Sequence, residues 1–185
     1  MTKSKRDPVT ADMRARLSTN REGKLTSTQW KEIVTEPIAT LLLLLVPTII
    51  FLRARIFYFV AGGGWLIGVA AVVILIGVIL MRAGRYARAP IHTGTFRAAE
   101  QFRPFWMFWK AEIFFDEAGR TVRFNKRLAP ASPHKTDEQY LIYYLKDGDG
   151  QILLSIAPAS HPDAAGWQPS PAFQARLALR QRSQR

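Results

Sequence analysis

The chain has 185 residues, a formal net charge of +12 and no cysteine. The lack of cysteine excludes disulfide bonds, thiolate metal sites and a cysteine nucleophile. A basic chain can bind nucleic acid, but here the basic residues are dispersed and follow the edges of two apolar runs, so no nucleic-acid partner is expected.

Residues 1–32 form a basic N-terminal tail. Within this tail, the stretch DPVTADMRARL predicts a short amphipathic helix that is capped by Asp7 and has an apolar face made of Val9, Met13 and Leu17. This face fits the surface of a membrane or a partner, and a frayed tail is the alternative.

Two apolar runs predict a transmembrane helical hairpin over residues 33–81. Residues 56–81 carry no charge, and residues 33–52 carry only Glu36, near one end. Each run is long enough to cross a hydrocarbon core of about 30 Å as a helix. Only residues 53–55 separate the runs, so both flanks are expected on one side of the membrane. Trp30 precedes the first run and is predicted to anchor it in the head-group layer.

Basic residues near the two spans predict the orientation. The flanks outnumber the two arginines of the turn and carry Arg21, Lys24, Lys31, Arg82, Arg85, Arg88 and Arg97. The positive-inside rule then places both termini in the cytoplasm, with the spans in an inner or plasma membrane. The flanks are also expected to contact anionic lipids, with Arg82 and Arg85 as interface anchors. Because the turn is itself basic, the reverse orientation is the alternative.

Small residues line one side of the second predicted span. Ala61, Gly64, Gly68 and Ala71 follow one another at helical spacing, and in lipid such a stripe lets two helix backbones pack closely. The stripe predicts a contact either with the first span or with another subunit. The same glycines do not form a dinucleotide-binding motif, because Ile67 stands where the third glycine is needed.

The rest of the chain predicts a small β-rich domain between two basic segments. Residues 82–102 read as a basic, irregular connector. Residues 103–157 predict two hairpins, one around DEAGR and one around DGDG, and therefore a four-stranded, mainly antiparallel sheet. Residues 158–185 predict an extended, proline-rich segment followed by a basic helix with Ser170 as its cap. The expected fold class is an α+β membrane protein, with a two-helix hairpin followed by this extramembrane domain.

An aromatic cluster lies in the first strand of the first predicted hairpin. It contains Phe105, Trp106, Phe108 and Trp109. Alternate side chains of a strand point in opposite directions, so one face of a strand cannot bury all of them. We expect some of these residues to be interface anchors that contact lipid or another protein.

No residue pattern indicates chemistry. The three histidines, His92, His134 and His161, lack the spacing of a zinc site, so no metal or cofactor is expected. Ionisable groups are nearly absent from the predicted spans, which disfavours transport by this chain alone.

These observations predict a non-catalytic accessory, scaffolding or assembly subunit of a larger membrane complex, with other integral-membrane subunits as partners. A respiratory or photosynthetic complex fits as the host, but no residue selects it. The alternatives are a membrane-tethered regulatory module that binds a ligand or lipid head groups and, less favoured, an enzyme acting on lipid.

Overall fold

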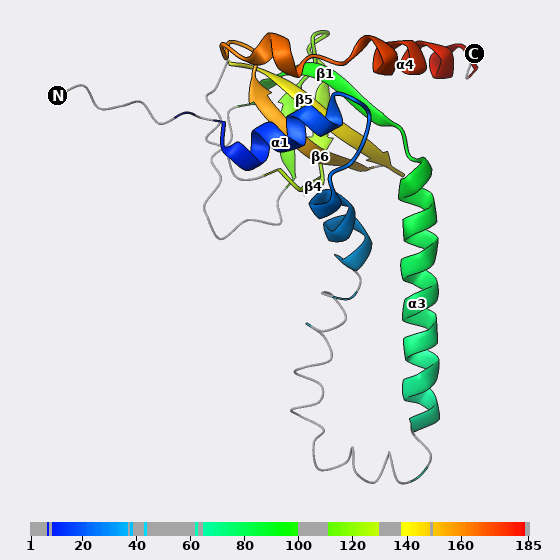
Figure 1. Cartoon of the computed structure of the whole chain (residues 1–185). Helices are drawn as coiled ribbons and strands as arrows, with labels where there is room; N and C mark the ends of the chain where they lie inside the picture. The colour runs from blue at the N-terminus through cyan, green and yellow to red at the C-terminus, as the bar shows by residue number, and fades with distance from the viewer. Residues whose placement is uncertain are drawn as a thin grey trace, which may run out of the picture. The chain divides into compact units, whose positions relative to one another are not determined.

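The chain folds as an α+β protein in two compact units. The computed structural model describes residues 7, 9–36, 38, 43, 62, 65–99, 111–129, 138–148 and 150–183. The first unit combines Met1–Gln29 with Pro90–Arg185, and the second is Trp30–Ala89. The sheet belongs to the first unit and the long helix α3 to the second (Figure 1).

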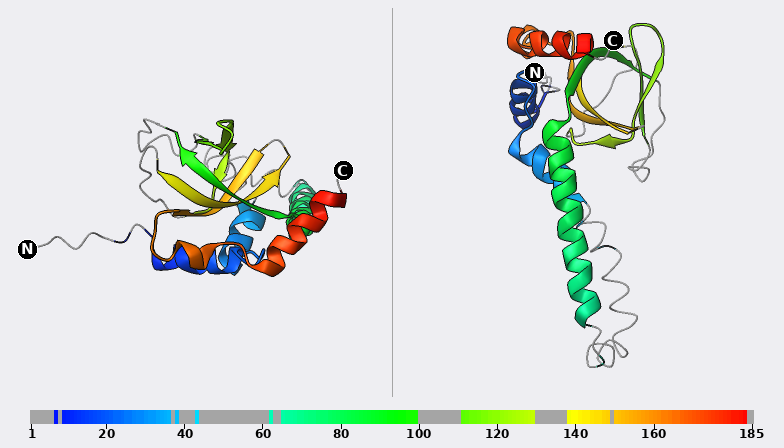
Figure 2. Two further views of the ribbon diagram at one scale, coloured as in Figure 1. Left: turned by 90° about the horizontal axis from the view of Figure 1, so that it is seen from above. Right: turned by 90° about the vertical axis from the view of Figure 1, so that its right-hand side faces the viewer.

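In the described part of the first unit, six strands form a curled sheet. In chain order its strands are β1 (Ile91–Ala98), β2 (Glu112–Phe115), β3 (Thr121–Phe124), β4 (Lys126–Arg127), β5 (Gln139–Asp147) and β6 (Gly150–Pro158). Their order in the sheet is β3-β2-β1-β5-β6-β4, and the pairing is antiparallel except between β4 and β6. The chain passes from β3 to β4 through Asn125, whose N–H donates to the Gln151 carbonyl over 3.0 Å. Because β3 and β4 lie at opposite edges in the pairing order, this short connection curls the sheet (Figure 2).

The prediction of four strands over residues 103–157 therefore gave too few strands and placed the start of the sheet too late in the chain. The hairpins around DEAGR and DGDG are present as β2–β3 and β5–β6. However, residues 91–98 form β1, and residues 82–88 continue a helix, so the expectation of an irregular connector was wrong. The sheet is also mixed, because β4 pairs in parallel with β6.

Aromatic side chains fill one face of the curled sheet. Phe124 makes edge-to-face contacts with Phe96, Phe114 and Tyr144, at ring-centroid distances of 5.8, 5.5 and 5.7 Å. Three of these residues are almost fully buried. Since neighbours along a strand point to opposite faces, Arg97 next to Phe96 is exposed.

Helix α1 (Ala11–Asn20) packs against β6 within the same unit. Its cap is Thr10, whose hydroxyl accepts from the Met13 N–H over 3.2 Å, so the predicted cap Asp7 was wrong. Val9, Met13 and Leu17 are buried in the unit. The apolar face expected to lie on a membrane or a partner is therefore already covered.

A buried polar network joins α1, β6 and the start of the next helix, which covers residues 27–36. Thr26 and Gln29 cap that helix reciprocally: the Thr26 hydroxyl accepts from the Gln29 N–H, and the Gln29 Oε1 accepts from the Thr26 N–H. The Gln29 amide also donates to Asn20 Oδ1 over 3.2 Å and to the Leu154 carbonyl over 2.9 Å. Ser155 Oγ donates to the same Asn20 oxygen over 2.9 Å. These bonds satisfy polar groups that would be costly to bury alone.

The C-terminal part begins with a short 3-10 helix, η2 (Ala164–Trp167), inside the segment expected to be extended. Helix α4 (Pro171–Ser183) follows with the predicted cap, since the Phe173 N–H donates to Ser170 Oγ over 3.3 Å. The Phe173 ring is buried against Gly23, where a Cβ would lie 2.6 Å from the ring.

The second unit contains α3 (Trp65–Arg88), the one helix among the described residues that is long and apolar enough to span a membrane. The predicted two-helix hairpin is therefore not confirmed as a whole. Of the first predicted span, 33–52, only residues 33–36, 38 and 43 are described, and residues 33–36 are helical.

Candidate functional site

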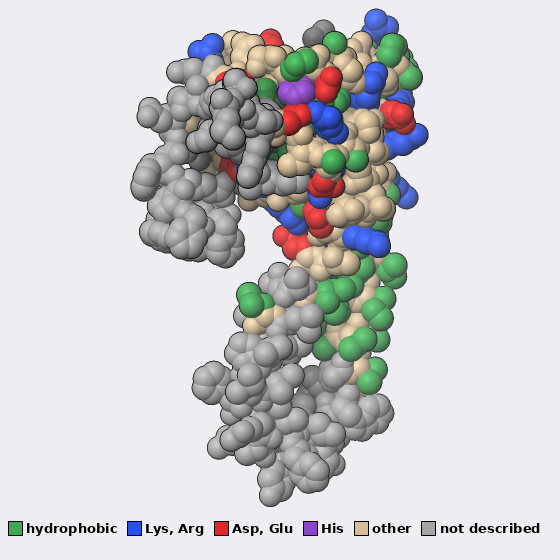
Figure 3. Space-filling model, turned by 60° about the vertical axis from the view of Figure 1, so that its left-hand side comes forward, with side chains coloured by type: hydrophobic (Ala, Val, Ile, Leu, Met, Phe, Trp, Pro, Cys, Tyr) green, Lys and Arg blue, Asp and Glu red, His purple; other side chains and the backbone are tan. Residues whose placement is uncertain are grey.

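The surface of α3 is the most distinctive feature of the described chain. Its candidate span, Val69–Arg88, has a mean hydropathy of 1.9, and only 6% of its most apolar 18-residue stretch is buried. Figure 3 shows apolar side chains gathered along this helix. More than half of the surface of each of the following is exposed: Leu66, Val69, Val72, Val73, Ile74, Ile76, Leu80 and Met81. A helix in the core of a soluble protein would bury such side chains, so this surface requires a lipid or protein cover.

Charged and aromatic groups mark the C-terminal end of this apolar surface. Arg82 Nη2 lies 2.5 Å from Glu36 Oε2 and 3.3 Å from the Ile33 carbonyl oxygen. Both Arg82 and Arg85 lie over the Tyr86 ring, at 5.5 and 5.9 Å from its centroid. Arginines at the end of an apolar helix are typical of the level where hydrocarbon gives way to head groups. The Tyr86 ring beneath them is itself buried.

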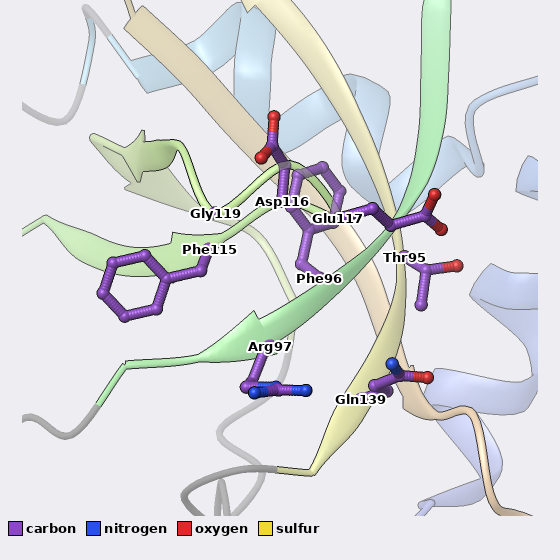
Figure 4. Close-up of a pocket in the computed structure, with 8 residues that line it drawn as sticks. All are labelled: Thr95, Phe96, Arg97, Phe115, Asp116, Glu117, Gly119 and Gln139. Carbon is purple, nitrogen blue, oxygen red and sulfur yellow. The ribbon is translucent and has the colours of Figure 1, made fainter.

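A hollow of about 330 Å³ lies beside the C-terminal half of β1. It is lined by residues of β1, β2, the β2–β3 turn and β5, namely Thr95, Phe96, Arg97, Phe115, Asp116, Glu117, Gly119 and Gln139 (Figure 4). Arg97 is paired across the sheet with Phe115 on one side and Gln139 on the other. Directly paired residues project to the same face, so an aromatic ring, a guanidinium and an amide form a row.

The acidic residue Asp116 of the hollow is held by hydrogen bonds within the described part of the protein, whereas the basic residue Arg97 is not. Asp116 Oδ1 accepts from the Ala118 and Arg120 N–H groups over 3.0 and 2.8 Å, and Arg120 Nε lies 2.8 Å from Asp116 Oδ2. The Arg120 N–H bond is the main cause of a lowered pKa of Asp116, which therefore stays ionised and tied to the turn. Arg97, by contrast, has no hydrogen bond or ion pair with any residue that the structure describes.

Two histidines lie in structured surroundings away from this hollow. His161 Nε2 is 3.2 Å from Asp7 Oδ1, and His161 Nδ1 accepts from the Asp163 N–H over 3.1 Å, which ties the N-terminal segment to η2. His92 stacks on Tyr144 with ring centroids 5.4 Å apart. Burial, followed by the charges of Lys146 and Arg180, lowers the pKa of His92. Within the described ranges, no group of three or more His, Asp or Glu side chains is placed to hold a metal ion.

The predicted site residues fall into two groups. Trp30 lies in the helix over residues 27–36 and is half-buried, whereas Arg82 and Arg85 lie near the end of α3 and Gly68 and Ala71 lie within it. The remaining candidates lie outside the described residues: Ala61, Gly64, Phe105, Trp106, Phe108 and Trp109.

Sequence reasoning did not find the row Phe115, Arg97 and Gln139. Phe115 is 18 positions and Gln139 is 42 positions from Arg97, and only the register of three strands brings them together. The alternation of apolar and polar residues in IHTGTF, residues 91–96, is weak because Gly94 interrupts the middle of β1. Because residues 91–98 were not predicted to form a strand, Arg97 was assigned only to the basic residues that flank the predicted spans.

Comparison with known proteins adds no family. The chain matches no protein-family model and no curated protein. Among solved structures, it is similar to silver-bound CusF, with 16% identity and a TM-score of 0.30 over 37% of this chain and 96% of the other. It is also similar to apo-CusF from Escherichia coli, with 16% identity and a TM-score of 0.31 over 39% of this chain and 90% of the other.

Proposed function

We propose that this protein is a non-catalytic accessory, scaffolding or assembly subunit of a larger integral-membrane complex. The observation that carries the proposal is the exposed apolar surface of α3, which has no charged residue between Trp65 and Met81. In a bilayer such a helix gains little by burying leucines and gains more by packing closely against other spans. Its partners are therefore other integral-membrane subunits.

The composition of the first unit supports two membrane crossings. Residues 1–29 and 90–185 fold together, as the bonds from Asn20 and Gln29 to Ser155 and Leu154 illustrate. Both ends of the segment 30–89 must then lie on one side of the membrane. A segment that starts and ends on one side crosses an even number of times, so a crossing by α3 requires another crossing between residues 30 and 64.

The orientation of this pair follows from the charges at its flanks. Arg85 and Arg88 are exposed in the last turn of α3, and Arg82 precedes them. By the positive-inside rule, these residues favour a cytoplasmic location for the first unit and for both termini.

Native sizing tests the accessory role. The protein is solubilised in a mild detergent, sized under native conditions, and its co-purifying chains are identified by mass spectrometry. We expect a complex larger than one chain in its micelle that contains other integral-membrane proteins. A monomer without partners would contradict the proposal.

Two matched glycine variants test which side of α3 makes the contact. Gly68→Leu places a large side chain on the small-residue stripe, whereas Gly77→Leu places one about 180° around the helix, where nothing lies within 4 Å of the added Cβ. We expect Gly68→Leu to reduce the assembled fraction or the thermal stability, and Gly77→Leu to leave both unchanged. Equal behaviour of the two variants would count against close packing at the stripe.

A second candidate is a membrane-tethered regulatory module that binds anionic head groups. The exposed Arg85 and Arg88 favour it, because each basic residue near an anionic surface contributes about 1 kcal/mol. Reconstitution of the purified chain into nanodiscs with and without phosphatidylglycerol tests this second candidate. A module gains thermal stability with the anionic lipid, and the gain is lost in Arg85→Gln/Arg88→Gln.

A further inference from the structure

We propose that the hollow beside Arg97 binds an acidic, extended segment of a partner protein. The inference rests on the proposed function and names the surface through which an accessory subunit would bind its partner outside the membrane. It rests on the arrangement of Phe115, Arg97 and Gln139 across three neighbouring strands.

The row of three side chains offers complementary contacts to a peptide. Arg97 is exposed and has no ion-pair partner in the described chain, so its guanidinium can form a two-point bond with a carboxylate. Phe115 is 38% exposed, which is unusual for a large apolar side chain in a strand, and offers an apolar contact beside that bond. The exposed Gln139 amide can donate to and accept from a peptide backbone.

The acidic rim of the hollow disfavours binding of a ligand's carboxylate at any position other than Arg97. Asp116 is occupied by the turn and by Arg120, and Glu117 is exposed next to it. Both acids repel a carboxylate, and the exposed Glu117 can accept an N–H group, so a ligand is oriented with its acidic group on Arg97. A peptide supplies both kinds of group, an acidic side chain and backbone N–H donors, whereas a lone inorganic anion supplies only the first.

The chemistry of the hollow favours a protein over lipid head groups. An extended peptide presents an acidic side chain, an apolar side chain and backbone N–H and C=O groups together, and these match Arg97, Phe115 and Gln139. A lipid head group carries an anionic phosphate but no apolar side chain for Phe115.

Titration with a defined peptide tests the hollow directly. The full chain in detergent micelles is titrated with the fluorescein-labelled, C-terminally amidated peptide Glu-Phe-Glu-Phe, followed by fluorescence polarisation. The control peptide is Gln-Phe-Gln-Phe, which has the same shape without the charges. We expect saturable binding of the acidic peptide, weakened about ten- to hundredfold by Arg97→Gln, because hydrogen bonds to charged groups contribute in this range.

Two further variants exclude a general charge effect. Arg123→Gln removes another exposed arginine, on β3, that does not line the hollow, and it is expected to leave binding unchanged. Arg97→Lys keeps the charge but loses the planar fork, so it is expected to bind between the wild type and Arg97→Gln. Equal effects of Arg97→Gln and Arg123→Gln, or no saturable binding, would overturn the proposal. Binding of phenylacetate as tight as that of the peptide would also overturn it, in favour of a small-molecule site.

The same variants separate this inference from the proposed function. In native sizing, Arg97→Gln is expected to lose a partner that the wild type and Arg123→Gln retain, while its membrane-inserted fraction stays unchanged. A complex that survives Arg97→Gln intact would overturn the inference alone. A wild type without partners would overturn the accessory role, and the peptide titration would still decide whether the hollow binds acidic segments.

Discussion

Tyr143 shows how one residue links burial to pH-dependent stability. Its hydroxyl donates to the Trp167 carbonyl over 2.7 Å, and burial raises its pKa to about 12. In the unfolded chain a tyrosine titrates near pH 10. Between pH 10 and about 12 the unfolded chain therefore loses a proton that the folded chain keeps. The stabilisation from Tyr143 is fully present below pH 10 and is lost as the pH rises towards 12.

Tyr143→Phe tests this linkage. We expect the variant to be about 1 kcal/mol less stable at pH 7, because it loses one buried hydrogen bond. Above pH 10 its stability is expected to fall less steeply than that of the wild type, by up to about 1.4 kcal/mol per pH unit. Denaturation midpoints between pH 8 and 11.5, followed by tryptophan fluorescence, measure both effects. Tyr144, whose pKa is also raised by burial, keeps part of the slope in the variant. Parallel pH profiles would refute the role of Tyr143.

Single residues also show what local sequence can and cannot predict. The cap Ser170 was predicted correctly, because a serine before Pro171 satisfies a helix start without help from the rest of the fold. The cap of α1 was misplaced from Thr10 to Asp7. Asp7 has a suitable side chain, but it bonds to the Val9 N–H and to His161, which is 154 positions away. Such a partner cannot be inferred from the neighbouring sequence.

The docking of α4 depends on one glycine. Gly23 has φ +73°, and a Cβ there would lie 2.6 Å from the Phe173 ring that anchors the helix. Gly119 has nearly the same φ, +75°, but open space around it. Alanine at either position pays for the left-handed backbone, about 1 kcal/mol, and only Gly23→Ala also displaces Phe173.

The pair Gly23→Ala and Gly119→Ala therefore isolates the contact between Gly23 and Phe173. We expect Gly23→Ala to be more destabilising than Gly119→Ala by about 1–3 kcal/mol, the usual cost of overpacking. It should also make α4 more sensitive to limited proteolysis. Thermal unfolding and the rate of cleavage within residues 171–183 measure the difference. Equal destabilisation would mean that the ring can move aside without cost.

Elements with local signals were predictable, and those made by distant pairing were not. The β5–β6 hairpin follows from an Asp-Gly turn between two apolar runs, and Gly148 has the positive φ, +58°, that such a turn needs. By contrast, β1 is interrupted by Gly94, and the strand is defined by its pairing with β5, from Ile91 with Leu145 to Arg97 with Gln139. The two-residue strand β4 exists only because β6 pairs with it in parallel, across 26 residues of sequence.

At the scale of the whole molecule, the chain leaves the first unit after Gln29 and returns to it at Pro90. Single cysteines introduced into the cysteine-free chain can test the two crossings that this arrangement supports. Ser18→Cys on α1 and Ala165→Cys on η2 are exposed positions of the first unit, and Ala54→Cys lies in the predicted turn. We expect a membrane-impermeant maleimide to label Ser18→Cys and Ala165→Cys from one side and Ala54→Cys from the other.

Inverted and right-side-out vesicles provide the two sides for this labelling. The orientation predicted from the basic flanks places Ser18→Cys and Ala165→Cys on the cytoplasmic side. Labelling of all three positions from one side would contradict a crossing between residues 30 and 64. Labelling of Ala54→Cys from the cytoplasm and of the other two from outside would reverse the orientation and leave the number of crossings unchanged.

The buried bond between Ser155 and Asn20 has a consequence for biosynthesis. The two residues are 135 positions apart, and a ribosome adding about 5–20 residues per second needs roughly 7–27 s to make that stretch. During this delay α1 has no β6 to pack on, so the side chains of Val9, Met13 and Leu17 stay uncovered until the C-terminal half of the chain has been made. The first unit can therefore close only after the whole of segment 30–89 has been synthesised, which gives the proposed membrane insertion of α3 time to precede that closure.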